Sequence, residues 1–201
     1  MDSDPGSNVT GSDGSGSMTT ILGISGSLRQ ASYNTALLRA MAAAAPAAVS
    51  VEIATLHGIP LYDGDVEAEG IPVAVTDLKE RVVAADGLLL VSPEYNNAIP
   101  GVFKNAIDWL SRPPKDSPRV FRGRPVAVVG ASPGGFGTIL AQNAWLPVLR
   151  TLGMLPWFGG RLAVSRAGGV FDADGKLVDE QVREQAAAFL AGFANFVEEQ
   201  R

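Results

Sequence analysis

The chain has 201 residues, enough for about one domain, and its 46% hydrophobic and 18% charged residues suit a buried globular core. A net charge of -5 argues against a general nucleic-acid binder, which needs a basic face. With no cysteine and one histidine, His57, the sequence excludes disulfides, thiolate nucleophiles and multi-histidine metal sites. No apolar run reaches the roughly 20 residues of a membrane span, so we expect a soluble, cytoplasmic protein.

Residues 1–17 form a segment of different composition. They contain four Gly, five Ser and three Asp. Such a segment cannot bury enough apolar surface to offset its ordering entropy, so we predict a disordered tail at 1–17. The remainder, 18–201, is predicted to be one domain.

From Thr19 onward, apolar runs and helical patterns alternate at regular intervals. Strands are expected at 19–25, 49–54, 87–92 and 125–130, with short strand segments around 154–165. Helices are expected at 32–48, 73–85, 101–110, 138–152 and 179–199, and the second carries apolar residues at 75, 78, 82 and 85. This alternation predicts an α/β fold: a doubly wound five-stranded parallel sheet with helices on both faces.

The first, third and fourth strands are the most hydrophobic and should lie at the centre, which fits the strand order 2-1-3-4-5. In that architecture ligands bind beyond the carboxyl ends of the strands, where the order switches between strands one and three. The residues that follow Ser25, Ser92 and Gly130 should therefore line one site.

The first of these loops, residues 26–35, carries hydroxyls, an amide and one guanidinium at the start of a helix. A helix N-terminus offers unpaired N–H groups and a positive dipole, so the loop is predicted to bind phosphate. It lacks the Gly-Lys-Ser/Thr ending of a P-loop and the spacing of GxGxxG. The missing fingerprint favours a mononucleotide with a terminal phosphate over a dinucleotide.

The other two loops suit a flat ring. Residues 93–100 are bracketed by Pro93 and Pro100 and carry Tyr95, while residues 131–138 contain Gly134 and Gly135. A rigid loop with an aromatic side chain can hold a heteroaromatic ring, and glycines allow its close approach to the backbone.

The motifs GSLR…SYNT, PEYN…PGVFKNAIDW and SPGGFG, read in order along the chain, resemble the NADPH-dependent FMN reductase family. The resemblance covers about 19–199 and implies a flavodoxin-like fold. It implies that the FMN phosphate is bound by Ser27, Leu28, Arg29, Ser32, Tyr33, Asn34 and Thr35. The isoalloxazine and ribityl parts would contact Pro93, Glu94, Tyr95 and Asn96. The pyrimidine side of the ring would meet Ser132, Pro133, Gly134 and Gly135.

The resemblance also implies an NAD(P)H oxidoreductase in which hydride passes through flavin N5 to quinones or other small acceptors in a ping-pong cycle. The flavin would carry the chemistry, so no catalytic side chain and no metal are expected. Backbone N–H groups of residues 132–135 would stabilise charge that develops at N1–C2. The sequence leaves open whether NADPH or NADH is the donor. Two other functions stay open: a flavodoxin-like electron carrier without NAD(P)H turnover, and a nucleotide-sensing or structural protein that has lost its flavin.

Other residues are expected to be structural. His57 follows a strand and is predicted to be solvated, and residues 172–175 to form a turn before the last helix. Phe103, Trp109 and Trp145 are predicted to pack in the core or between subunits, because members of this family usually form dimers or tetramers.

Overall fold

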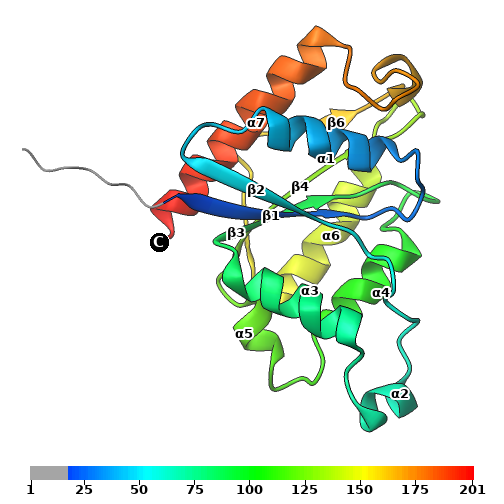
Figure 1. Ribbon diagram of the computed structural model, residues 1–201, viewed down its shortest axis with the longest axis vertical. Coiled ribbons are helices and arrows are strands. Elements are labelled where there is room, and N and C mark those ends of the chain that lie inside the picture. The colour runs from blue at the N-terminus through cyan, green and yellow to red at the C-terminus, as the bar shows by residue number, and fades with distance from the viewer. Residues whose placement is uncertain (1–17) are drawn as a thin grey trace, which may run out of the picture.

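The computed structural model describes residues 18–201, so the predicted disordered tail at 1–17 lies outside the described residues. The strands are β1 (Thr19–Ser25), β2 (Val49–Ala54), β3 (Gly87–Val91), β4 (Pro125–Ala131), β5 (Leu155–Pro156) and β6 (Ala163–Val164). The helices are α1 (Tyr33–Ala43), α2 (Gly64–Glu69), α3 (Val73–Ala84), α4 (Gly101–Leu110), α5 (Ser117–Phe121), α6 (Ile139–Leu152) and α7 (Glu180–Glu199), with one 3₁₀ turn at Ala167–Gly169. Figure 1 shows their arrangement around one twisted sheet.

The sheet is parallel throughout, in the order β2-β1-β3-β4-β5, with β6 also paired to β4. The predicted doubly wound fold and its strand order are confirmed. The predicted fifth strand is divided: β5 pairs with the start of β4 at Pro125 and Val126, and β6 pairs with its end at Gly130 and Ala131. A Gly-Gly pair lies between the two pieces, and glycine weakens a strand interior.

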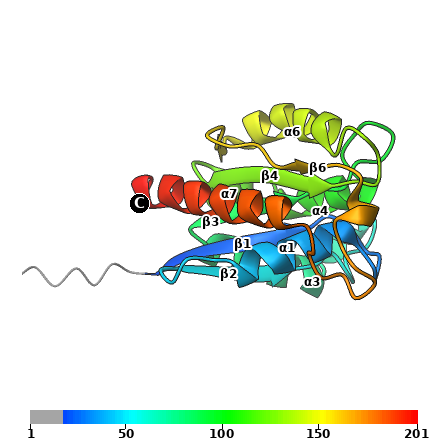
Figure 2. The ribbon, with the colours of Figure 1, turned by 90° about the horizontal axis from the view of Figure 1, so that it is seen from above.

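Helices cover both faces of the sheet, as Figures 1 and 2 show. Helices α1 and α7 pack on one face, where Ile21 of β1 joins a buried cluster. Helices α3, α4, α5 and α6 pack on the other, against Leu22 and Ile24. Alternate residues of β1 thus enter opposite cores, as a doubly covered strand requires. The predicted core positions of the second helix are confirmed, since Val75, Leu78, Val82 and Ala85 are all buried.

Local differences from the expected elements have physical causes. The first helix ends at Ala43 rather than at residue 48. Pro46 explains the early end, because proline disfavours helical backbone in the residue before it and cannot donate an N–H. Helices α2 and α5 were not expected: they hold only 6 and 5 residues, too few for a clear periodic pattern.

The three large aromatic residues predicted to lie in the core or between subunits belong to the core of the single chain. Phe103, Trp109 and Trp145 are each 0% exposed. The rings of Phe103 and Trp145 meet edge to face at a centroid distance of 4.9 Å. An aromatic with no exposed surface has none to offer a second subunit, so a subunit interface needs other residues.

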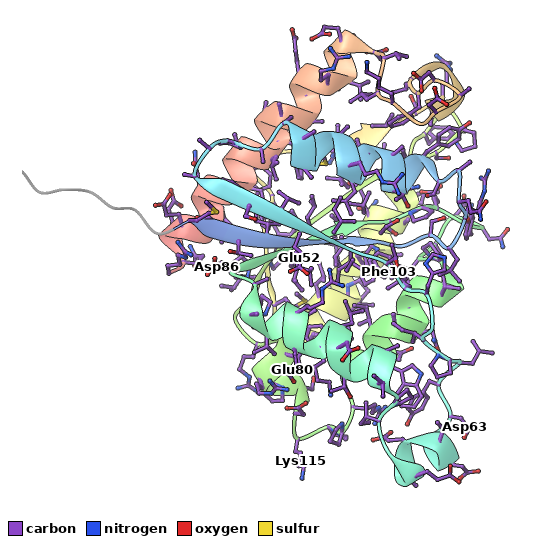
Figure 3. The ribbon with its side chains drawn as sticks, in the orientation of Figure 1. Glu52, Asp63, Glu80, Asp86, Phe103 and Lys115 are labelled. Carbon is purple, nitrogen blue, oxygen red and sulfur yellow. The ribbon has the colours of Figure 1, made fainter. Side chains whose placement is uncertain are left out.

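The two ends of the sheet are closed differently. At the amino end, Asp86 accepts a hydrogen bond from the Thr20 backbone N–H and pairs with Arg201 at 2.7 Å. Phe103 marks the opposite end, where three loops project beyond β1, β3 and β4 (Figure 3). Within residues 18–201, none of the helices has the length and apolar character to cross a membrane.

Candidate active site

The three loops predicted to share a site do meet. One small pocket, of about 40 Å³, is lined from all three of them. Its lining residues are Ser27, Arg29, Ser32, Tyr33, Asn34, Pro93, Glu94, Tyr95, Ala131, Ser132 and Pro133. A pocket of this size has room for one compact polar group and not for a ring system. Of the predicted residues, Leu28, Thr35, Asn96, Gly134 and Gly135 do not line it.

Loop 1, residues 26–32, directs hydrogen-bond donors to this pocket. The exposed guanidinium of Arg29 has no ion pair within residues 18–201. Ser27 is 4% exposed, and its hydroxyl accepts the Arg29 N–H at 3.2 Å, which leaves the hydroxyl proton for a ligand. The N–H groups of Tyr33 and Asn34 open α1 without an acceptor in the described chain. These donors fit a phosphate monoester.

Gly26 lets loop 1 enter the site. A Cβ on Gly26 would stand 2.2 Å from Cδ1 of Phe103, and a Cβ atom essentially never comes closer than about 3 Å to another atom. Phe103 is fully buried under the loop, so a larger residue at 26 would lift the loop away from the sheet. The close packing of this glycine sets the position of Ser27.

Two residues expected to bind phosphate face inward instead. The Asn34 side chain donates to the Ala131 carbonyl at 2.8 Å and accepts the Ala131 N–H at 2.9 Å. The Thr35 hydroxyl lies 2.8 Å from that of Ser25, in a buried contact. Ser32 caps α1, its hydroxyl accepting the Thr35 N–H at 3.3 Å. The side chains of Asn34 and Thr35 therefore hydrogen-bond within the protein and position the loop, while the backbone N–H of Asn34 stays available to a ligand.

Loop 2, residues 92–100, is held by a carboxylate and a tight turn. One Glu94 oxygen accepts the N–H groups of Leu140 and Ala141 at 2.9 and 3.0 Å, which caps α6. A carboxylate there is stabilised by the helix dipole. Asn96 and Asn97 have φ values of 50° and 62°, between residues 95 and 98, which pair as in a hairpin. The Glu94 carboxylate thus anchors the loop, and the Asn-Asn turn projects from it.

Loop 3, residues 132–138, has fewer free N–H groups than predicted. The Ser132 N–H donates to the Val164 carbonyl at 2.9 Å, and that of Gly134 donates to the Ser132 hydroxyl at 3.1 Å. Pro133 has no N–H. Of the four residues expected to stabilise negative charge with their N–H groups, only Gly135 keeps one without an acceptor in the described chain.

The backbone of residues 166 and 167 fixes loop 3 from outside the predicted motifs. The Arg166 N–H donates to the Gly134 carbonyl at 3.0 Å, and the Ala167 N–H to the Ser132 carbonyl at 3.1 Å. Arg166 has a φ of 49°, a positive value that is uncommon outside glycine, and this backbone conformation accompanies the two hydrogen bonds to loop 3. No sequence motif marks the segment, because its role depends on a contact across 32 residues of chain.

Exposed apolar side chains project from all three loops. Leu28, Tyr95 and Phe136 are 42%, 49% and 78% exposed. A single exposed apolar residue is ordinary on a protein surface, but one on each of three neighbouring loops gives a group that can border an apolar ligand. Together they favour a flat, partly apolar ligand or substrate at the mouth of the site.

His57 and the segment 172–175, both predicted to be structural, have the expected structure. His57 is exposed, as predicted, and its Nε2 lies 3.3 Å from the Leu28 carbonyl of loop 1. Residues 172–175 form a turn closed by the Gly175 N–H to the Asp172 carbonyl at 3.0 Å. Within residues 18–201, no three His, Cys, Asp or Glu side chains form a cluster that could hold a metal ion.

A parallel sheet in the order 2-1-3-4-5, with its ligand loops at the switch between β1 and β3, defines the flavodoxin-like class of α/β proteins. Comparison with known proteins narrows the class. Residues 19–169 match the model of the family described as NADPH-dependent FMN reductase. The chain therefore belongs to the NADPH-dependent FMN reductase family, and it is an oxidoreductase with FMN as cofactor and NAD(P)H as donor.

Individual relatives agree with this family. The chain is 47% identical over 164 residues to the NAD(P)H-dependent FMN reductase PA1204 of Pseudomonas aeruginosa, covering 82% of this chain and 87% of that protein. It is 36% identical to a 2-hydroxy-1,4-benzoquinone reductase of a Burkholderia species, covering 88% and 94%. Among solved structures, the flavoenzyme NAD(P)H:(acceptor) oxidoreductase FerB of Paracoccus denitrificans aligns with a TM-score of 0.81 at 31% identity, covering 91% and 99%.

Proposed function

We propose that this oxidoreductase passes reducing equivalents from NAD(P)H to quinones or similar small acceptors in a ping-pong cycle, in the cytoplasm where the nicotinamide donor is regenerated. When bound, FMN supplies the redox chemistry, with N5 of its ring as the position that takes up hydride. The observation that carries the proposal is the single pocket shared by three loops at the switch point of the sheet. The quinone reductases among the relatives support the choice of acceptor.

In this proposal the phosphate of FMN is held by loop 1. Ser27 and Arg29 contribute a hydroxyl and a guanidinium, and the Tyr33 and Asn34 N–H groups contribute the start of α1. Leu28 is exposed on the same loop, while Ser32 and Thr35 keep the loop in place through their hydroxyl contacts. A charge-assisted bond from Arg29 contributes more than the neutral bonds do.

Loops 2 and 3 would hold the ribityl chain and the ring. Pro93, Glu94, Tyr95 and Asn96 would contact the isoalloxazine and ribityl parts, the Glu94 side chain acting as a brace to α6. Ser132, Pro133, Gly134 and Gly135 would face the pyrimidine side. Since the Ser132 and Gly134 N–H groups are occupied, the Gly135 N–H is the donor left to stabilise charge near N1–C2.

The donor and the acceptor would use one open face of the ring in turn. Tyr95 and Phe136, both exposed, would give that side an apolar border, which suits a flat quinone and the nicotinamide ring alike. Reduction of a quinone to a hydroquinone takes up a proton as well as the hydride, and this proton would come from solvent rather than from a side chain of the site.

The decisive experiment is an absorption spectrum of the purified protein, followed by NADPH addition without oxygen and then by a quinone. We expect a flavin spectrum that bleaches with NADPH and returns with the quinone, and continuous NADPH consumption when both are present. A flavin spectrum that NADPH and NADH leave unchanged would make the chain an electron carrier. A protein that stays colourless after FMN addition would overturn the flavin site itself.

We also propose that the protein is a homodimer or homotetramer. Phe103, Trp109 and Trp145 are buried, so the interface would use other residues. Leu61 and Val73, which are 81% and 76% exposed, flank α2 and are available for it. Light scattering after size exclusion measures the mass, and a mass near the chain's own 20.9 kDa would refute the proposal.

A further inference from the structure

A second pocket adjoins the first at the start of α1. Its volume is about 410 Å³, and it lies between loop 1 and the turn at residues 171–175. It shares three residues with the first pocket: Arg29, Ser32 and Tyr33. Small-molecule sites have volumes of roughly 300–1,000 Å³, so the space suits a nucleoside-sized group.

The second pocket contains an arginine without a partner. Arg39, in the middle of α1, is exposed and makes no ion pair or side-chain hydrogen bond within residues 18–201. Some exposed arginines of the chain contact a carboxylate, as Arg119 and Arg183 do. Arg29, the second guanidinium at this pocket, is also unpaired, and both face one concave surface. With FMN bound, Arg29 would be paired with the FMN phosphate, so Arg39 is the guanidinium at this pocket that stays available to a second phosphorylated group.

The facing wall supplies acceptors on a fixed turn. One Asp172 oxygen accepts the N–H groups of Asp174 and Lys176 at 3.0 and 2.8 Å, which fixes the turn. The Asp174 carboxylate is exposed and without a hydrogen-bond partner in the described chain, so it can accept from a hydroxyl. Tyr33 and Phe171 stack at a centroid distance of 5.8 Å and give the pocket an aromatic side. The guanidinium, carboxylate and aromatic groups of this pocket suit, respectively, the phosphate, the ribose hydroxyls and the base of a nucleotide.

We propose that this second pocket takes the adenosine end of NADPH, with Arg39 on its 2′-phosphate, an inference that rests on the proposed function. With the nicotinamide at the flavin ring, the rest of the donor must lie on neighbouring protein surface, and the two pockets are joined through Arg29, Ser32 and Tyr33. The 2′-phosphate is the group by which NADPH differs from NADH. Arginine is suited to bind it, because its planar guanidinium can make two parallel hydrogen bonds to a phosphate. Arg39 would therefore set the choice between the two donors.

The test uses FMN-loaded protein and the variants Arg39→Ala and Arg39→Lys. Arg150→Ala is the matched control, because Arg150 is also an exposed helical arginine without an ion pair within residues 18–201 but lies on α6. Calorimetry measures the binding of adenosine 2′,5′-bisphosphate, and steady-state kinetics give kcat/KM for NADPH and for NADH with one quinone.

Arg39→Ala should weaken bisphosphate binding and lower kcat/KM for NADPH by about tenfold, while kcat/KM for NADH and the Kd of FMN stay within about twofold. Arg39→Lys should recover part of the loss, and Arg150→Ala should match the wild type. An unchanged NADPH-to-NADH ratio in Arg39→Ala, or equal bisphosphate binding by it and the wild type, would overturn the assignment. Calorimetry needs no turnover, so failure of the oxidoreductase proposal is seen separately, as absence of NAD(P)H oxidation by the wild type.

Discussion

Charged side chains are arranged in opposite ways in two regions of the molecule. Between α3 and α5, the buried Lys79 pairs with Asp116 at 2.9 Å, and Arg119 pairs with both Asp116 and Glu80. On loop 1 and on α1, Arg29 and Arg39 have no carboxylate partner within residues 18–201. Figure 3 shows Glu80 on α3, on the other side of the sheet from α1.

The comparison separates charged residues that stabilise the fold from charged residues that are available to bind a ligand. Charges that satisfy one another need no ligand, and their loss should destabilise the fold. Unpaired cations cost little while they are exposed to water, and they remain available to a phosphate. Variants of the paired network should therefore lower the free energy of unfolding, and variants of the unpaired arginines should lower ligand affinity.

The largest effect is expected from Lys79→Met. Lys79 is 4% exposed and donates to the Arg112 carbonyl as well as to Asp116. Its loss leaves that carbonyl without this donor and Asp116 with one cation, and we expect the free energy of unfolding to fall by about 2–3 kcal/mol. Urea unfolding of the FMN-loaded protein measures it. The exposed control Lys115→Met should change stability by less than about 0.5 kcal/mol. Equal stability of the two variants would mean that the network contributes nothing.

A second variant concerns Asn34, which lies next to the unpaired arginines but makes its side-chain hydrogen bonds within the protein. Asn34→Ala removes both hydrogen bonds to Ala131. The backbone N–H and carbonyl of Ala131 are then buried without these partners. We expect a loss of about 2 kcal/mol in stability, and also weaker FMN binding, since this clamp joins loop 1 to loop 3. The exposed control Asn143→Ala should show neither change. If Asn34→Ala weakened FMN binding with full stability, Asn34 would be a direct ligand, as its sequence position first suggested.

That contrast shows what the sequence could predict. The strand order and the meeting of three loops follow from the hydrophobicity of β1, β3 and β4 and from the alternation of strands with helices. The inward direction of Asn34 does not, because its partner Ala131 is 97 residues away. Likewise the Glu94 carboxylate reaches Leu140 across 46 residues. The residue types indicate polar side chains at Asn34 and Glu94. Only the packed structure decides whether the hydrogen-bond partner of each side chain is the protein or a ligand.

On the binding side, Arg29→Ala should raise the Kd of FMN by about tenfold and Ser27→Ala by severalfold, because the guanidinium makes the charge-assisted bond. Turnover of FMN-saturated enzyme should change little in either, and the stability of Arg29→Ala should stay within about 0.5 kcal/mol, since its side chain has no ion pair within residues 18–201. Fluorescence titration gives the affinity, at low and high salt. An FMN affinity that neither substitution alters would contradict the phosphate role of loop 1.

The last effect concerns pH and belongs to the paired region. Hydrogen bonds from Arg119 and then Lys79 lower the pKa of Asp116 from 3.8 to about 2. A carboxyl whose pKa is lower in the folded state stabilises the fold above its unfolded pKa, and this contribution disappears as the pH falls from about 4 to about 2. Wild type should therefore lose about 1–2 kcal/mol more than Asp116→Asn between pH 5 and pH 2, the figure being reduced for partial exposure. Asp77→Asn, whose exposed carboxylate makes no ion pair within residues 18–201, should keep the wild-type acid profile. Parallel acid profiles for wild type and Asp116→Asn would show that solvent screens the ion pairs of Asp116. The paired region would then differ from the unpaired one in geometry but not in its contribution to the free energy of unfolding.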